Sequence, residues 1–180
     1  MITTASLHDT TELNVLINAA YRGEESKKGW TTEAEILGGI RIDEMTLKAM
    51  LDQGKGAIMK YTGMDGEMLG TVYLEVKMPS LYLGMFAVSP LAQNKGIGKA
   101  LLSFAEGFAL VNGCDRITIT VISTRGELID WYKRHGYVPT GHSIAFADIK
   151  GRFGDPKVEA IDLIEMHKML SREIIGSTVI

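Results

Sequence analysis

Cysteine is nearly absent from this sequence: Cys114 is the single one among 180 residues. One cysteine cannot form a disulfide within the chain, so we expect a fold held by apolar burial and a cytoplasmic location. Cys114 directly follows Asn112 and Gly113, a pair typical of a helix end, and has no histidine beside it. We therefore interpret Cys114 as structural rather than nucleophilic.

Long apolar runs and a basic excess are also missing. Apolar stretches such as 117–122 are interrupted by threonine and are too short to span a bilayer, and the start, MITTASLHDT, predicts no signal peptide. The net charge is -3 and the pI about 5.8, so we expect neither a nucleic acid nor a membrane as a partner. The four histidines show no metal-ligand spacing with Cys114, so no metal is expected.

What is present suits one folded domain over residues 1–180. Apolar residues make up 46% of the chain, enough for one α/β core, whereas the length is short for two domains. Helices are expected over about 10–20, 43–52, 99–111 and 127–135, the last opened by a capping box of Thr124 and Glu127. Strands are expected over 2–5, 55–62, 67–78, 81–88, 116–122, 137–140 and 161–170. This order of strands and helices predicts a mixed sheet.

The segment 81–102 carries the clearest chemical signal. An apolar strand stops at Ser89 and Pro90, and Gly96-Ile97-Gly98 then leads into a helix. Glycines let several backbone N–H groups converge, and a helix N-terminus adds about half a positive charge. Together these features predict a cradle for a pyrophosphate.

On the glycines alone, a simple turn before a helix explains this loop equally well. A dinucleotide fingerprint would need a third glycine where Leu101 stands. A nucleotide-triphosphate loop would need a hydroxyl residue where Ala100 follows Lys99.

Two motifs together resemble the GNAT superfamily of N-acetyltransferases. Gln93-x-x-Gly96-x-Gly98, following Phe86-Ala87-Val88, resembles the acyl-CoA-binding motif of that family. The segment 127–136, ELIDWYKRHG, followed by Tyr137, resembles the helix that carries a tyrosine four residues before a glycine and an aromatic residue. The resemblance covers about 80–140. It implies a mixed, mostly antiparallel central sheet of six to seven strands flanked by about four helices.

The resemblance implies acetyl-CoA as cosubstrate and names the residues that hold it. Backbone groups near the end of the strand 81–88 would pair with the pantetheine arm, and main-chain N–H groups of the loop would bind the pyrophosphate. The strand 116–122 would splay away to make room for the thioester. The expected cofactor residues are Phe86, Ala87, Val88, Gln93, Asn94, Lys95, Gly96, Ile97, Gly98 and Lys99.

For catalysis, Tyr132 matches the tyrosine that serves as general acid in many family members. A phenol keeps its proton at neutral pH and can donate it to the leaving thiolate. The alternative is a tyrosine that only packs the helix against the sheet. The general base stays unassigned, because Thr120 stands where many relatives have glutamate; Glu75, His135 or a water are the alternatives.

The acceptor site is expected in the N-terminal third, where Tyr21, Arg22, Trp30 and Glu33 suggest a polar pocket with an aromatic wall. Glu33 or Glu25 could pair with a cationic amine, and Arg22 or Arg41 could hold a carboxylate. The same residues could instead form an ordinary solvated face. The loop 151–157 could cover this site.

The expected function is therefore transfer of an acetyl group from acetyl-CoA to a primary amine of a small molecule, such as an amino acid, a polyamine or an aminoglycoside-like compound. A protein or peptide N-acetyltransferase is the first alternative. A non-catalytic acyl-CoA sensor is the second, kept open by Thr120. A homodimer that uses the apolar tail 174–180 is a further expectation.

Overall fold

A seven-stranded sheet forms the centre of the molecule in the computed structural model, which describes residues 1–151 and 153–171. Its strand order is β1-β3-β4-β5-β6-β9-β7, and all neighbours are antiparallel except β5 and β6. The expected mixed sheet is therefore confirmed, while the tail 174–180 lies outside the described residues. The strands are β1 (Ile2–Thr4), β3 (Ala57–Thr62), β4 (Met68–Lys77), β5 (Ser80–Val88), β6 (Arg116–Ile122), β7 (Val138–Ala145) and β9 (Asp162–Met169).

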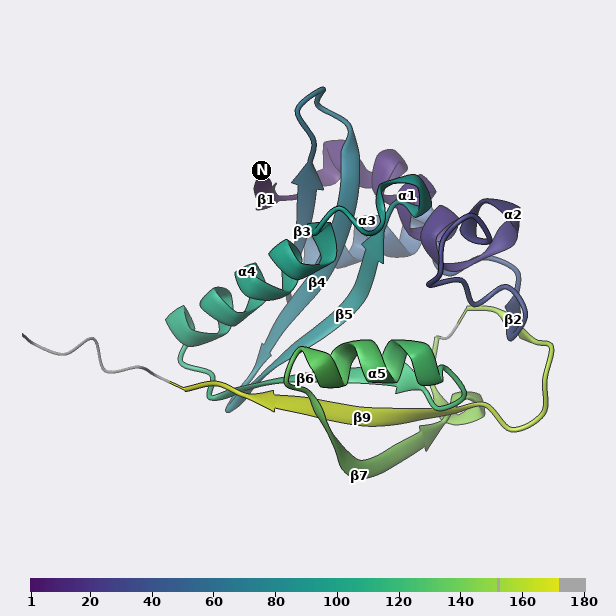
Figure 1. Cartoon of the computed structure of the whole chain (residues 1–180). Coiled ribbons are helices and arrows are strands. Elements are labelled where there is room, and N and C mark those ends of the chain that lie inside the picture. Colours follow the sequence, from purple (N-terminus) through teal and green to yellow (C-terminus); the bar gives the residue numbers. More distant parts are fainter. Residues whose placement is uncertain (152, 172–180) are drawn as a thin grey trace, which may run out of the picture.

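Helices cover both faces of the sheet (Figure 1). One face carries α1 (Thr10–Tyr21) and α3 (Glu44–Gln53), and the other carries α4 (Ile97–Val111) and α5 (Gly126–Arg134). The two longest helices, α1 and α4, each bury an apolar stripe of helical spacing, as amphipathic helices do. In α1 the stripe is Leu13, Leu16, Ile17 and Ala20; in α4 it is Ile97, Leu101, Leu102, Ala105 and Ala109.

The starts and ends of the other helices follow from single residues, not all of them as expected. The Asp43 side chain accepts a hydrogen bond from the Thr46 amide, which caps α3. The capping box predicted from Thr124 and Glu127 at the start of α5 is wrong: the cap residue is Arg125, and its side chain donates a hydrogen bond to the Glu127 carboxylate. The strand β7 continues to Ala145, five residues beyond the expected end.

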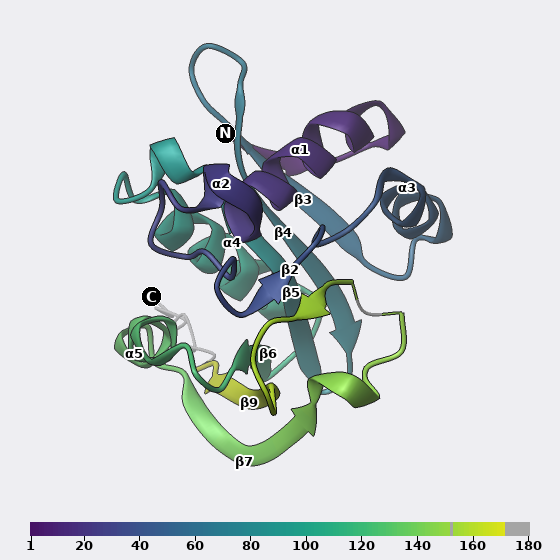
Figure 2. The same ribbon diagram turned by 90° about the vertical axis from the view of Figure 1, so that its right-hand side faces the viewer.

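A small second sheet joins two segments that lie far apart in the sequence. The strand β2 (Leu37–Gly38) pairs with β8 (Asp155–Pro156), which lies within the loop expected over 151–157. Figure 2 shows this pair facing the viewer in front of β5, with the short helix α2 (Gly23–Ser26) above it. The Lys157 side chain strengthens the junction by donating to the Ala34 carbonyl.

The two parallel strands share only one end. Ser80, Leu81 and Tyr82 of β5 pair with β6, and no pairing follows beyond Tyr82. The register between β4 and β5 shifts next to Met85, whose φ of 44° marks a bulge. Figure 1 shows β5 and β6 diverging from this shared end toward α2, so the expected splay is present.

Candidate functional site

A cavity of about 380 Å³ lies where β5 and β6 separate. Its walls are the ends of these two strands, the loop before α4, and one face of α5. Two more segments close it, one from α1 to Arg41 and one around Phe146–Asp148 and Phe153. The cavity therefore collects side chains from every third of the chain.

The loop before α4 has the geometry of an anion cradle. Asn94 and Gly96 both adopt a left-handed backbone, with φ of 63° and 81°, and α4 begins at Ile97 directly afterwards. The first amides of a helix have no partner within the helix, so those of Ile97, Gly98 and Lys99 are available to a ligand. A Cβ added at Gly96 would meet nothing within 4 Å, so the space beside it is open. These features fit the pyrophosphate of coenzyme A.

Most of the expected cofactor residues line the cavity, and two do not. Ala87 is buried in the core under α1 and α3, and Lys95 is an exposed residue outside the cavity wall. The residues that line it are Phe86, Val88, Gln93, Asn94, Gly96, Ile97, Gly98 and Lys99.

Gln93 uses its side chain to hold a second loop. Its Oε1 accepts a hydrogen bond of 2.9 Å from the Trp30 amide, and its Nε2 donates one of 2.8 Å to the Thr31 hydroxyl. Gly29 packs so closely that an added Cβ would lie 2.7 Å from Gln93 Oε1. The cradle and the loop 29–31 are thus joined through one side chain.

Tyr132 lies in the cavity wall inside an aromatic cluster. Its ring centre is 5.1 Å from that of Trp131, 5.3 Å from that of Tyr137 and 6.4 Å from that of Phe86. Burial, together with the nearby Tyr21, raises the pKa of the Tyr132 hydroxyl well above its ordinary value. A phenol in this environment keeps its proton and can only act as a donor of that proton or as a packing group.

One of the candidate bases is engaged elsewhere: Glu75 pairs with Lys77 at 3.1 Å and does not line the cavity. His135 does line it, and its ring centre lies 4.1 Å from that of Trp131. Its Nδ1 lies 2.8 Å from the Trp131 carbonyl and must therefore donate, which leaves the lone pair of a neutral imidazole on Nε2. Thr120 also lines the cavity, on β6, and a threonine hydroxyl is no base.

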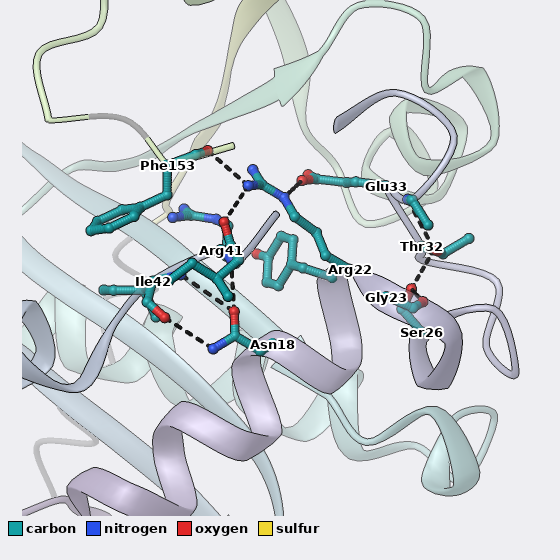
Figure 3. A network of polar contacts seen from close by, with 12 residues as sticks. Asn18, Arg22, Gly23, Ser26, Thr32, Glu33, Arg41, Ile42 and Phe153 are labelled. Atoms are coloured by element: carbon teal, nitrogen blue, oxygen red, sulfur yellow. Dashed lines mark hydrogen bonds and ion pairs between the residues drawn. The ribbon is translucent and has the colours of Figure 1, made fainter. Parts of the chain in front are cut away.

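All four expected acceptor residues, Tyr21, Arg22, Trp30 and Glu33, lie in this same cavity. Arg22 is 5% exposed, and its Nη1 donates to the carbonyls of Ile40 and Phe153. Its Nε lies 3.5 Å from Glu33 Oε2. Figure 3 shows the two side chains pointing toward each other. Arg22 therefore ties the N-terminal segment to the loop around Phe153, a structural task that the sequence did not reveal.

Glu33 is the only carboxylate in the cavity wall among the described residues. Burial raises the pKa of this carboxyl, and the positive charges of Arg41, Arg22 and Arg125 offset only part of that rise. Tyr21 donates a hydrogen bond of 3.0 Å to the Phe86 carbonyl, and burial raises its pKa to about 12. Tyr21 is therefore neutral and tied to β5.

Several cavity residues were absent from the expected acceptor site. Arg125 is 4% exposed and donates to the carbonyl of Thr31, and the Trp131 ring lies 6.3 Å from that of Trp30. Phe146 and Phe153 close the far side. Phe153 belongs to the loop 151–157, which was expected to cover this site; the other three belong to no local motif for an acceptor pocket, so only the fold brings them together.

Within 1–151 and 153–171, no three His, Cys, Asp or Glu side chains are grouped so that they could hold a metal ion. In the same part of the chain, no helix has the length and apolar character needed to cross a membrane.

Comparison with known proteins decides the family. The model of the acetyltransferase (GNAT) family matches residues 11–137. The chain belongs to the GNAT family. It is an acetyl-CoA-dependent N-acetyltransferase, as members of this family use acetyl-CoA as cosubstrate. No curated protein matches the sequence.

Solved structures of the GNAT fold agree with this assignment. The ribosomal-protein-S18-alanine N-acetyltransferase from Escherichia coli is 16% identical, with a TM-score of 0.68 over 100% of this chain and 98% of that chain. An N-acetyltransferase from Staphylococcus aureus Mu50 is 15% identical, with a TM-score of 0.66 over 95% and 98%. Nourseothricin acetyltransferase is 21% identical over 66% of this chain and 68% of its own, with a TM-score of 0.56. At these identities the likeness shows the fold alone.

Proposed function

We propose that this GNAT enzyme acetylates the primary amine of a small molecule inside the cavity between β5 and β6. The observation that carries the proposal is the cover over the acceptor end. There, β2 pairs with β8, and Arg22 bonds the carbonyls of Ile40 and Phe153. A protein acceptor would need an open groove for an extended peptide, whereas this cover favours a compact ligand.

The residues of the cavity suit the parts of this reaction. The amides of Ile97, Gly98 and Lys99 would hold the pyrophosphate of acetyl-CoA, which supplies the acetyl thioester. Tyr132, kept protonated by burial, would donate its proton to the departing sulfur. Glu33 would attract the acceptor amine as the carboxylate of the cavity wall.

The test is release of free coenzyme A from acetyl-CoA, followed with a thiol-reactive dye and a panel of acceptors. The panel holds amino acids, simple amines, spermidine, an aminoglycoside and short peptides. Cys114 is fully buried and burial raises its pKa, so the enzyme alone should react slowly with the dye. We expect turnover with a small amine and none with peptides. Turnover with peptides alone would overturn the small-molecule assignment.

A further inference from the structure

The acceptor end of the cavity contains three arginines, and only two of them are paired. Arg22 lies against Glu33, and Arg125 donates to the carboxylate of Glu127 at 2.8 Å. The guanidinium of Arg41 has no carboxylate within 4.0 Å and no hydrogen-bond acceptor in the part of the chain that the structure describes. Arg41 thus leaves one uncompensated positive charge in the cavity wall.

The fold holds Arg41 in place from both sides. The Asn18 side chain accepts a hydrogen bond of 2.6 Å from the Arg41 amide and donates one to the Ile42 carbonyl (Figure 3). The Arg41 guanidinium lies 5.2 Å from the centre of the Tyr21 ring, and Tyr21 is bonded to Phe86. This chain of contacts fixes the guanidinium relative to β5.

Arg41 and Glu33 interact through their charges without forming an ion pair. Among the neighbouring charges, that of Arg41 lowers the pKa of the Glu33 carboxyl most, yet the two side chains form no ion pair within 4.0 Å. Two further donors are also left over nearby: Nη2 of Arg125 and Nε of Arg22 are buried and have no hydrogen-bond partner among the described residues. Buried donors normally find a partner, so the wall lacks an acceptor group.

We propose that the acceptor is an amine that also carries a carboxylate, and that Arg41 binds this carboxylate while Glu33 faces the ammonium group. The inference rests on the proposed small-molecule function and narrows its substrate class. A free guanidinium presents paired N–H donors that match a carboxylate. A polyamine or an aminoglycoside would instead bring several positive charges toward the unpaired charge of Arg41 and is disfavoured.

The test compares amino acids with their amides, for example phenylalanine with phenylalaninamide and methionine with methioninamide. Each pair keeps the side chain and the α-amine and differs only in the carboxylate. The amide has the less basic and more reactive amine, so intrinsic reactivity opposes the expected preference. We expect kcat/KM to favour the acid at least tenfold and Arg41→Gln to abolish that preference, because a charge-assisted bond is lost. Arg41→Lys should keep part of it, and Arg116→Gln, which changes an arginine that pairs with Asp115, should keep all of it.

Calorimetry supplies a readout that does not need turnover. The acid, but not the amide, should bind to the enzyme saturated with coenzyme A, and Arg41→Gln should abolish the binding while its thermal unfolding stays cooperative. Equal use of acids and amides by the wild type would overturn the inference and leave the small-molecule function standing. A preference for acids that survives in Arg41→Gln would overturn the role of Arg41. Absence of both turnover and binding across all small amines would overturn the proposed function itself.

Discussion

At the scale of single residues, two neighbouring tyrosines have opposite expected roles. Tyr132 lies in the cavity wall, whereas Tyr137 lies outside it and is fully buried, with a hydroxyl that has no hydrogen-bond partner among the described residues. Their rings contact each other at 5.3 Å. Removing each hydroxyl in turn therefore distinguishes a role in proton donation from a role in packing within the same aromatic cluster.

We expect Tyr132→Phe to lower kcat about a hundredfold, with little change in KM for acetyl-CoA, because a positioned proton donor contributes about that factor. Since burial and the nearby Tyr21 raise the pKa of Tyr132 well above 10, the wild-type donor keeps its proton at higher pH. The wild-type kcat should therefore not fall between pH 7 and 10 through loss of this proton. Steady-state kinetics across this pH range test the prediction.

Tyr137→Phe is the matched control. It removes a buried, unpartnered hydroxyl, so kcat should stay unchanged and stability should rise or stay the same. Normal turnover by Tyr132→Phe, or an equal loss of activity in both variants, would show that Tyr132 packs rather than donates.

At the scale of elements, the sequence predicted what is local and missed what is not. The helices α1, α3 and α4 follow from apolar stripes and from turn residues, all of which are read within a dozen positions. The mostly exposed strand β7 lacks an alternating pattern, which explains why its second half was not recognised. The cap of α5 was misjudged because Glu127 has a competing partner, the side chain of Arg125.

The candidate site shows the same division. The cradle before α4 is one continuous segment, so its glycines could be found in the sequence. The acceptor wall combines Arg41, Arg125 and Phe153, and no spacing in the sequence relates residues that only the fold brings together. Arg22 looked like a ligand for a carboxylate, but its Nη1 donates to two backbone carbonyls that a sequence cannot place.

The contact between the cradle and the loop 29–31 should matter for the binding of acetyl-CoA. Gln93→Ala removes the bonds to Trp30 and Thr31, and Gly29→Ala should push the Gln93 side chain away, because the new Cβ would lie 2.7 Å from it. Each variant should raise KM for acetyl-CoA several-fold, since the two lost hydrogen bonds are worth about 1 kcal/mol each.

A double variant tests whether the two changes act through the same contact. Without the Gln93 side chain, the Cβ at position 29 has room, so the double variant should resemble Gln93→Ala alone. Gln53→Ala, at the exposed end of α3, serves as the control and should behave like the wild type. Additive effects on KM would contradict a shared contact.

At the scale of the whole molecule, the sheet is joined across its centre by core packing more than by backbone pairing. The strands β5 and β6 are hydrogen-bonded only from Ser80 to Tyr82, yet one apolar core runs from Val72 on β4 through Leu101 on α4 to Met166 on β9. Because this core crosses the junction, the two halves of the sheet should unfold together. A ligand that fills the gap between β5 and β6 would bridge both halves.

We therefore expect a single thermal unfolding transition. Binding of coenzyme A should raise its midpoint temperature without splitting the transition in two. A ligand at a hundred times its Kd adds about 2.7 kcal/mol of stability, or roughly 5–10 °C in a chain of this size. Circular dichroism and tryptophan fluorescence should report the same midpoint, because Trp30 and Trp131 lie on different segments of the cavity wall. ATP, which has phosphates but no pantetheine arm to enter the gap, should shift the midpoint less. Two separate transitions, or a shift seen by only one probe, would mean that the halves are independent and that the gap is not where the cofactor binds.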